Sequence, residues 1–200
     1  WSLAQVKVMV MTSTEGNDEL HGYGTDDLVS GGLGNDSLYG EGGNDVLVGG
    51  VGNDVMDGGA GSDIYRFERG WGQDTINNYD TTAGKIDALE FGADIKPEDL
   101  VLTRTDSHLN IALKGSSDKI TVRYFFSSGY QLEEIRFANG TTWSLAQVKV
   151  MVMTSTDGND ELHGYGTDDL VSGGLGNDSL YGEGGNDVLV GGVGNDVLDG

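Results

Sequence analysis

The pattern of the whole chain is set by residues 31–39, which read GGLGNDSLY. The same order of glycines, one Asp and one apolar residue returns in residues 40–48 and again in residues 49–57. An Asp recurs every nine residues from Asp18 to Asp63, and a large apolar residue stands two positions after each one. A strict period defines a repeating structural unit, so it has to be interpreted before any single motif.

Each nine-residue unit has two halves with different chemistry. The half Asp-x-apolar-x alternates, which predicts a short strand with one buried face. The glycine-rich half predicts a tight turn in which backbone carbonyls converge. If two units make one turn of a flattened coil, units i and i+2 stack at strand spacing, roughly 4.8 Å.

Stacking of this kind places Asp36 over Asp54 and Asp27 over Asp45. Two carboxylates at strand spacing repel by ~1 kcal/mol in water and by several at lower dielectric. A hard cation that accepts carboxylate and carbonyl oxygens removes this conflict. Calcium fits best, because magnesium keeps its waters and zinc prefers Cys and His. We therefore expect several calcium ions as the cofactor, and disordered arrays without them.

These residues resemble the RTX (repeats-in-toxin) haemolysin-type calcium-binding family, whose repeat is G-G-x-G-x-D-x-apolar-x. Residues 31–57 match closely, apart from Glu41 at the second glycine position; the outer units 13–21 and 22–30 depart further. The resemblance implies an all-β fold, with right-handed parallel β-roll arrays that flank a small mainly-β capping domain.

The resemblance also implies how calcium is held between stacked loops. One loop gives the carbonyls of its first and third residues plus its Asp, and the other gives those of its second and fourth plus its Asp. One such site would use Gly32, Gly34 and Asp36 with Gly49, Val51 and Asp54. The complete set of expected calcium ligands is Asp18, Asp27, Gly31, Gly32, Gly34, Asp36, Gly40, Gly42, Gly43, Asp45, Gly49, Val51, Asp54, Gly58, Asp63, Asp160, Asp169, Gly173, Gly174, Gly176, Asp178, Gly182, Gly184, Asp187, Gly191, Val193 and Asp196. Stacked pairs give up to four sites in the first array and three in the second.

A second, longer repetition organises the chain. Residues 143–200 duplicate residues 1–58 with two changes, Glu15 to Asp157 and Met56 to Leu198. The offset of 142 residues indicates a tandem array in a longer parent protein, whose neighbouring repeat units are expected partners. The expected domains are a linker or N-terminal cap (1–12), a β-roll (13–66), a mainly-β capping domain (67–142), a second linker or cap (143–154) and a truncated roll (155–200). Because no cap follows the last roll, we expect weaker calcium binding there.

The segments outside the repeats have recognisable elements. Trp1–Met11 and its copy Trp143–Met153 predict a short helix, N-capped by Ser2 or Ser144, that fades into an extended tail; its apolar side is expected to cover the first turn of the roll. The capping domain predicts a hairpin at Asn139-Gly140 and one helical turn at Pro97. Its expected strands are Asp87–Phe91, Leu100–Thr105, Leu109–Leu113, Lys119–Phe125 and Leu132–Phe137.

Aromatic residues of the capping domain allow two interpretations. Trp71, Tyr124, Phe125 and Phe126 are expected in its core, and the alternative is an aromatic sugar-binding platform at residues 124–126.

The composition excludes several classes of partner. The net charge is −22 and the 11 Lys and Arg form no dense basic patch, so nucleic acid and anionic membranes would be repelled. There is no Cys, no run long enough to span a bilayer, and no signal peptide at the start of the chain.

Catalytic chemistry is also missing from the sequence. The only histidines are His21, His108 and His163; the first and last occupy the same position in the two copies, where surface or end packing is expected. A ladder of equivalent Asp residues lacks the unlike pair that glycosidase chemistry needs. Nine-residue spacing selects Asp27 as a ligand and leaves Asp26 solvated. The predicted protein is not an enzyme.

The function we expect is a calcium-binding structural segment of a secreted RTX protein. The resemblance implies that it crosses the cell envelope unfolded by type I secretion and folds where calcium is abundant. As alternatives, it is a ligand-binding adhesin module with an unidentified host ligand, or an accessory C-terminal segment of a secreted toxin or enzyme. The long repeat favours a tandem extender at the bacterial cell surface or outside the cell.

Overall fold

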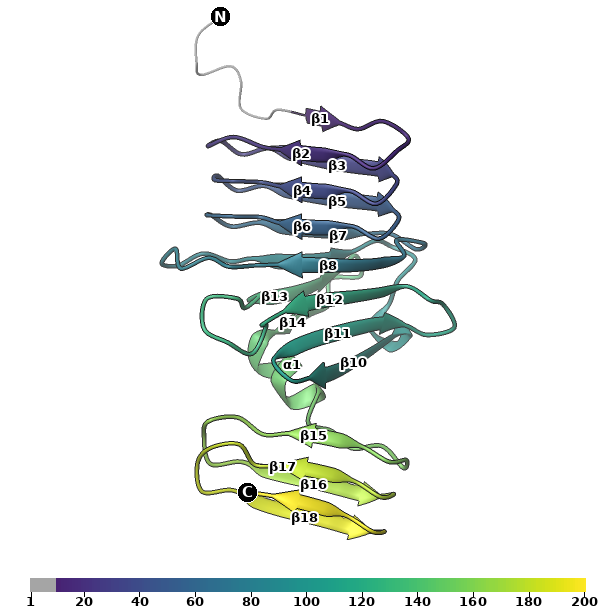
Figure 1. Cartoon of the computed structure of the whole chain (residues 1–200), viewed down its shortest axis with the longest axis vertical. Helices are drawn as coiled ribbons and strands as arrows, with labels where there is room; N and C mark the ends of the chain where they lie inside the picture. Colours follow the sequence, from purple (N-terminus) through teal and green to yellow (C-terminus); the bar gives the residue numbers. More distant parts are fainter. Residues whose placement is uncertain (1–9) are drawn as a thin grey trace, which may run out of the picture. The chain divides into compact units, whose positions relative to one another are not determined.

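The computed structural model describes residues 10–200 and forms two compact units. The first unit ends at Leu145 and the second comprises Ala146–Gly200. In both units parallel strands stack one above the next, as Figure 1 shows. The flattened coil predicted from the nine-residue period is observed, and the parallel β-roll that the resemblance implies is confirmed.

Two seven-stranded sheets build the first unit. One contains, in spatial order, β1 (Val10–Thr12), β3 (Leu28–Leu33), β5 (Val46–Val51), β7 (Ile64–Phe67), β9 (Ala88–Phe91), β13 (Glu134–Phe137) and β14 (Thr142–Ser144). The other contains β10 (Leu100–Thr105), β11 (His108–Leu113), β12 (Lys119–Arg123), β8 (Gln73–Asn77), β6 (Val55–Asp57), β4 (Ser37–Tyr39) and β2 (Glu19–His21). Successive units of the repeat therefore alternate between the sheets.

The apolar residue two positions after each Asp packs between these sheets. Val29, Leu38, Leu47, Met56 and Tyr65 all have 0% exposure. Burial of one such side chain stabilises the fold by about 1.5–3 kcal/mol. The core of the array is thus built from one side chain of each of these five units, while Leu20 of the first unit is only partly buried.

Both sheets continue without interruption from the array into residues 67–142. β8 and β9 pair in parallel with β6 and β7, and the sheets then end in antiparallel pairs, β10–β11–β12 and β13–β14. The expected hairpin at Asn139-Gly140 joins β13 to β14, and a 3₁₀ turn spans Pro97–Asp99. The strand pairing shows no boundary at residue 67. A separate capping domain therefore stays a prediction.

Three expectations about elements need correction. β12 and β13 are shorter than expected, because Tyr124 has a φ of 54°, which ends the extended backbone, and because β13 begins only where it pairs with β9. β8 was not expected as a strand. The helix α1 (Leu145–Met151) follows Ser144 as predicted, but it replaces the extended tail, since the Val152 N–H donates to the Val148 carbonyl at 3.1 Å.

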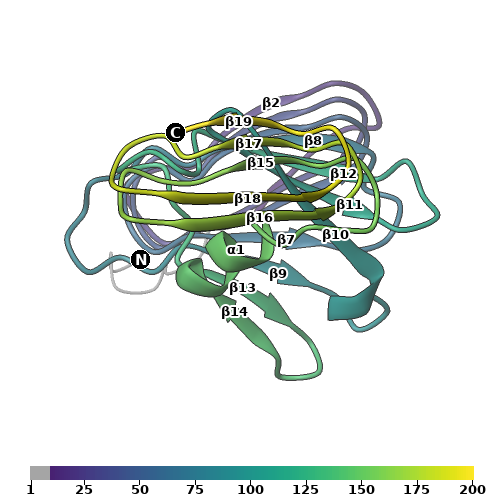
Figure 2. The same ribbon diagram turned by 90° about the horizontal axis from the view of Figure 1, so that it is seen from below.

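The second unit repeats the roll in shorter form. β15 (Glu161–His163), β17 (Ser179–Tyr181) and β19 (Val197–Asp199) form one sheet, and β16 (Leu170–Leu175) and β18 (Val188–Val193) form the other. Figure 2 shows these two sheets facing each other. The expected helix at the start of Trp1–Met11, and its contact with the first roll, lie outside the described residues. Within residues 10–200 no helix is long and apolar enough to cross a bilayer.

Candidate metal centres

The aspartates of the first array form two columns, one for each set of alternate units. Within a column, each Asp backbone N–H donates to Oδ1 of the Asp one coil turn later. The distance is 2.8 Å from Asp36 to Asp54 and from Asp45 to Asp63. Asp54 donates in the same way to Asp74. One carboxylate oxygen of each Asp is thereby committed to holding adjacent turns together.

The other carboxylate oxygen, Oδ2, is buried without a hydrogen-bond partner through much of both columns. Among the residues that the structure describes, this holds for Asp36, Asp45, Asp54, Asp63, Asp74 and Asp178. A buried carboxylate oxygen without a partner is costly. The same unsatisfied atom recurs at successive inner positions from Asp36 to Asp74, which is the arrangement expected where cations bind.

Burial also makes the ionised form of these Asp carboxylates unfavourable unless a positive charge lies nearby. Burial raises the pKa of Asp45 to about 6, that of Asp63 to about 7 and that of Asp74 to about 8, and the charges of neighbouring Asp residues add to the effect. A bound cation acts in the opposite direction, because its charge favours the ionised carboxylate.

A glycine keeps the space open beside the unpartnered oxygen of every one of these Asp residues except Asp74. A Cβ placed on Gly31 would lie 2.4 Å from Asp36 Oδ2 and 2.5 Å from the Gly49 carbonyl oxygen. A Cβ on Gly40 would meet Asp45 Oδ2 and the Gly58 carbonyl at similar distances. Carboxylate and carbonyl oxygens are the donors that calcium prefers, so the residues present fit this ion.

Backbone carbonyls have to complete any such site. No group of three or more His, Asp or Glu side chains suited to a metal exists between residues 10 and 200. The expected ligand Val51 uses its carbonyl to accept the Gly34 N–H at 3.0 Å, and a carbonyl has a second lone pair. Which of the expected carbonyls bind an ion stays a prediction.

The outer units differ from the inner ones in how their Asp is used. The Thr14 N–H donates to Asp18 Oδ2 at 2.8 Å, and the Tyr23 N–H donates to Asp27 Oδ2 at 2.9 Å. The copies Asp160 and Asp169 are bonded in the same way by Thr156 and Tyr165. In the inner units the corresponding second residue has positive φ, 85° at Gly32 and 103° at Gly50. The expected ligands in the outer units are thus already occupied by their own turn.

Glu41 takes the second-glycine position and keeps the backbone of that position, with a φ of 73°. Its carboxylate pairs with His21 Nδ1 at 2.9 Å, while His21 Nε2 lies 3.1 Å from Glu19. The His21 ring stacks on Tyr39 at 4.5 Å between centroids. The hydrogen bonds to Glu41 and Glu19 raise the pKa of His21. His21 is the last residue of β2, and these contacts hold its side chain in place. Its copy His163 makes the same contacts with Glu161, Glu183 and Tyr181.

Two further columns, made largely of Asn side chains at the position before each Asp, were not foreseen. The Asn35 N–H donates to Asn17 Oδ1 and the Asn53 N–H to Asn35 Oδ1, both at 2.8 Å. Asp26 stands in the other of these columns and accepts the Asn44 N–H at 2.8 Å, and Asn44 Oδ1 in turn accepts the Ser62 N–H at 2.9 Å. Asp26 is exposed and Asp27 is 2% exposed, which agrees with their different expected roles.

Two further members of the Asp columns were also missed, because the nine-residue spacing is lost there. Asp74 follows Asp54 by 20 residues, and Asp87 follows Asp63 by 24. Their only sequence signal is the apolar residue two positions later, Ile76 or Leu89, each with 0% exposure.

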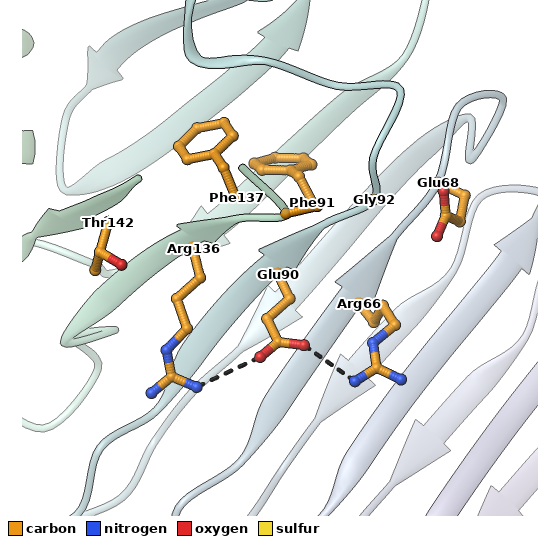
Figure 3. A pocket seen from close by; sticks show the side chains of 9 residues that line it. Arg66, Glu68, Glu90, Phe91, Gly92, Arg136, Phe137 and Thr142 are labelled. Atoms are coloured by element: carbon orange, nitrogen blue, oxygen red, sulfur yellow. Dashed lines mark hydrogen bonds and ion pairs between the residues drawn. The ribbon is translucent and has the colours of Figure 1, made fainter. Parts of the chain in front are cut away.

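A concave surface on β7, β9 and β13 has two arginines in its lining, Arg66 and Arg136 (Figure 3). Arg66 lies 3.0 Å and Arg136 3.5 Å from the same carboxylate, Glu90. Arg136 also pairs with Glu134 at 2.7 Å. The positive charges are thus matched by acidic partners, in keeping with the lack of a dense basic patch in the sequence.

The expected core aromatics divide into two groups. Trp71 and Phe125 are buried, at 2% and 0% exposure. Tyr124 is instead 48% exposed, because its positive φ turns it out of the sheet, and its ring lies 5.2 Å from that of Tyr130. Phe126 is half-buried beneath the Arg104 guanidinium, 4.8 Å from the ring centroid.

Comparison with known proteins identifies the repeats. The model of the RTX calcium-binding nonapeptide repeat (4 copies) matches residues 10–38, 30–65, 39–76, 152–180 and 163–198, together more than half of the chain. The model of the haemolysin-type calcium binding protein related domain matches residues 108–147.

Two individual proteins are similar to parts of the chain. The iron-regulated protein FrpA of Neisseria meningitidis serogroup C is 43% identical over 115 residues, 56% of this chain and 10% of that protein. The chain thus spans about a tenth of this relative's length. The solution structure of the AlgE6R3 subunit of the Azotobacter vinelandii mannuronan C5-epimerase is 27% identical, with a TM-score of 0.40, over 54% of this chain and 70% of that one.

Proposed function

The chain belongs to the family of RTX calcium-binding nonapeptide repeats, and on that premise we propose that it is a calcium-dependent structural segment. Calcium binds between stacked turns, and its binding free energy becomes folding free energy, because the sites exist only once the turns are stacked. The segment performs no catalysis. It acts as an extender within a longer secreted protein that leaves the cell by type I secretion and folds outside it.

One observation carries this proposal: the repeated, buried and unpartnered Oδ2 of the Asp columns. In the inner turns, Asp36 and Asp54 would hold one ion, and Asp45 and Asp63 another. The carbonyls of Gly49 and Gly58, which border the same spaces, would add to the ligands. When bound, calcium supplies the positive charge that lets these carboxylates stay ionised while buried.

A calcium titration of the full chain tests the proposal. In calcium-free buffer the far-ultraviolet circular dichroism spectrum should show a largely unordered chain, and added calcium should produce a cooperative transition to β structure. Calorimetry on the same samples gives the number of ions, for which stacked pairs predict up to seven. Magnesium at the same concentration is the control and should leave the spectrum unchanged. Rolls that are fully formed in excess chelator would contradict the proposed mechanism.

A second function, as a ligand-binding adhesin module, is favoured by one surface feature. Tyr79 and Tyr124 are 58% and 48% exposed, and both rings contact Tyr130, at 4.9 and 5.2 Å between centroids. A row of exposed aromatic rings suits the apolar face of a sugar. Binding to a glycan array that is lost in the double variant Y79A/Y124A would support this role. If no glycan on the glycan array binds, the adhesin function is refuted and the extender function remains.

A further inference from the structure

One position of the Asp columns already holds a positive charge that belongs to the protein. Asp87 ends its column and is 0% exposed, yet its Oδ2 has partners, unlike that of Asp63 one turn earlier. The Lys85 ammonium donates to Asp87 Oδ2 at 2.6 Å, and Asn78 Nδ2 donates to the same oxygen at 2.8 Å.

The oxygens around the Lys85 ammonium form a set that calcium also uses. Besides Asp87 Oδ2, they are the Gln131 carbonyl at 3.2 Å and both carboxylate oxygens of Glu133, at 3.3 and 3.2 Å. This amounts to one monodentate carboxylate, one carboxylate held through both oxygens, and one backbone carbonyl. Calcium takes such mixed oxygen ligands. The Lys85 side chain is only 8% exposed, so these oxygens replace most of its water.

The surroundings hold these oxygens in place from several elements. Glu133 Oε2 accepts the Asp87 N–H at 2.8 Å, and Asn78 Oδ1 accepts the Tyr65 hydroxyl at 2.8 Å. Asp87 Oδ1 accepts the Asp63 N–H at 2.9 Å, which is the bond of the regular column. A cavity of about 310 Å³, lined by Lys85, Gln131 and Glu133 among others, opens beside the ammonium. An ion in solution could reach the position through this cavity.

We propose that Lys85 is a tethered substitute for calcium at the end of the column Asp27–Asp45–Asp63–Asp87. This inference rests on the proposed function. A tethered cation does not dissociate when calcium is scarce, so the turn at Asp63 and Asp87 stays folded without ions and offers the array a formed end. The position is also a latent calcium site, because its oxygens remain when the ammonium is removed.

Two substitutions of Lys85 in the full chain distinguish the loss of the positive charge from the opening of space for an ion. Lys85→Ala removes the ammonium and its stem, and should add one calcium ion per chain to the stoichiometry measured by calorimetry. In chelator, amide hydrogen exchange of residues 86–92 should be at least tenfold faster in K85A than in the natural chain, and calcium should restore the protection. Lys85→Met keeps the stem, so it should lose the protection in chelator without gaining an ion.

The outcomes distinguish this inference from the function on which it rests. If the natural chain binds no calcium, the proposed function fails and the inference fails with it. If the natural chain binds calcium, but K85A shows the same stoichiometry and the same protection in chelator, only the role of Lys85 is overturned. A K85A chain that stays unprotected at saturating calcium also overturns it, since the vacated oxygens then hold no ion.

Discussion

The two arrays have almost the same sequence and differ in what lies next to them. In the first array Asp45 and Met56 are 0% exposed, and the following strands β7 and β8 cover them. In the second, Asp187 is partly exposed and Leu198 is 46% exposed. Burial of a unit, and therefore the environment of its Asp, is supplied by the next turn and not by the unit itself.

The segments that precede the two arrays show that neighbouring contacts also decide the backbone conformation. Val10-Met11-Thr12 forms β1 and pairs with β3, whereas the identical Val152-Met153-Thr154 forms a turn after α1. Local propensity is a weak constraint when tertiary contacts oppose it. Four measurements test whether the two copies differ because of what lies next to them.

The largest effect is expected from pH in the absence of calcium. Burial raises the pKa of Asp45, Asp63 and Asp74 to about 6, 7 and 8 from an ordinary 3.8, so the folded first array binds more protons than the unfolded chain between about pH 4 and pH 8. Its stability should therefore fall as pH rises through this window. The second array, whose Leu198 is 46% exposed, serves as the internal comparison.

Circular dichroism in calcium-free buffer at pH 5, 6, 7 and 8 measures this dependence, because a chain that is largely unordered at neutral pH should regain β structure as the pH falls. Hydrogen exchange separates the arrays through peptides that contain Glu15 or Met56 in the first and Asp157 or Leu198 in the second. A first array whose stability is constant or rises with pH would show that Asp45, Asp63 and Asp74 do not bind extra protons in the folded state.

Core truncation should also distinguish the copies. Leu47 has 0% exposure, so Leu47→Ala should destabilise the calcium-loaded first array by about 2–5 kcal/mol. Leu189 is only partly buried, and Leu189→Ala should cost less than half as much. Thermal unfolding in saturating calcium gives both values, and equal losses would mean that the next turn does not determine burial.

Removal of one carboxylate should weaken calcium binding by a smaller amount. Asp45→Asn is expected to lower the affinity of its site about tenfold, which is ~1.4 kcal/mol. Asp187→Asn should lower it less, because the exposed site is better screened by water. Asp26→Asn makes the same charge change at an Asn-column position and is the matched control, with unchanged affinity by calorimetry. A D26N effect as large as that of D45N would refute the assignment of the columns.

The smallest effect is expected at the second position of the turn, where the copies should agree. Glu41 and Glu183 have φ values of 73° and 72°, a conformation that costs a residue with a side chain about 1–2 kcal/mol. Glu41→Gly removes this strain but also the pair with His21, an exposed pair that contributes little to stability. E41G and E183G should therefore each change stability by about 1 kcal/mol or less. Glu41→Ala, which loses the pair and keeps the strain, should destabilise; different effects in the two copies would show that the turn is not autonomous.

The regular part of the molecule could be predicted because one period determines it. Nine-residue spacing gave the strands, the inward residues such as Leu38, and the Asp columns. The columns continue to Asp74 and Asp87 by strand pairing, which replaces the lost spacing and leaves no period to detect. Lys85 meets Glu133 across 48 residues, a contact that only the folded sheets bring about. Tyr124 was misplaced because alternation predicts a face but not the turn that ends a strand.

The alternation of units between two sheets also governs how such a chain can change in length. Each strand pairs with the strand 18 residues away, as Leu28 pairs with Val46. Loss or gain of a single nine-residue unit would move every following strand to the opposite sheet and join the array to β8 and β9 in the wrong order. We therefore expect insertions and deletions to be tolerated in steps of two units, so that the array changes in length by whole turns of the coil.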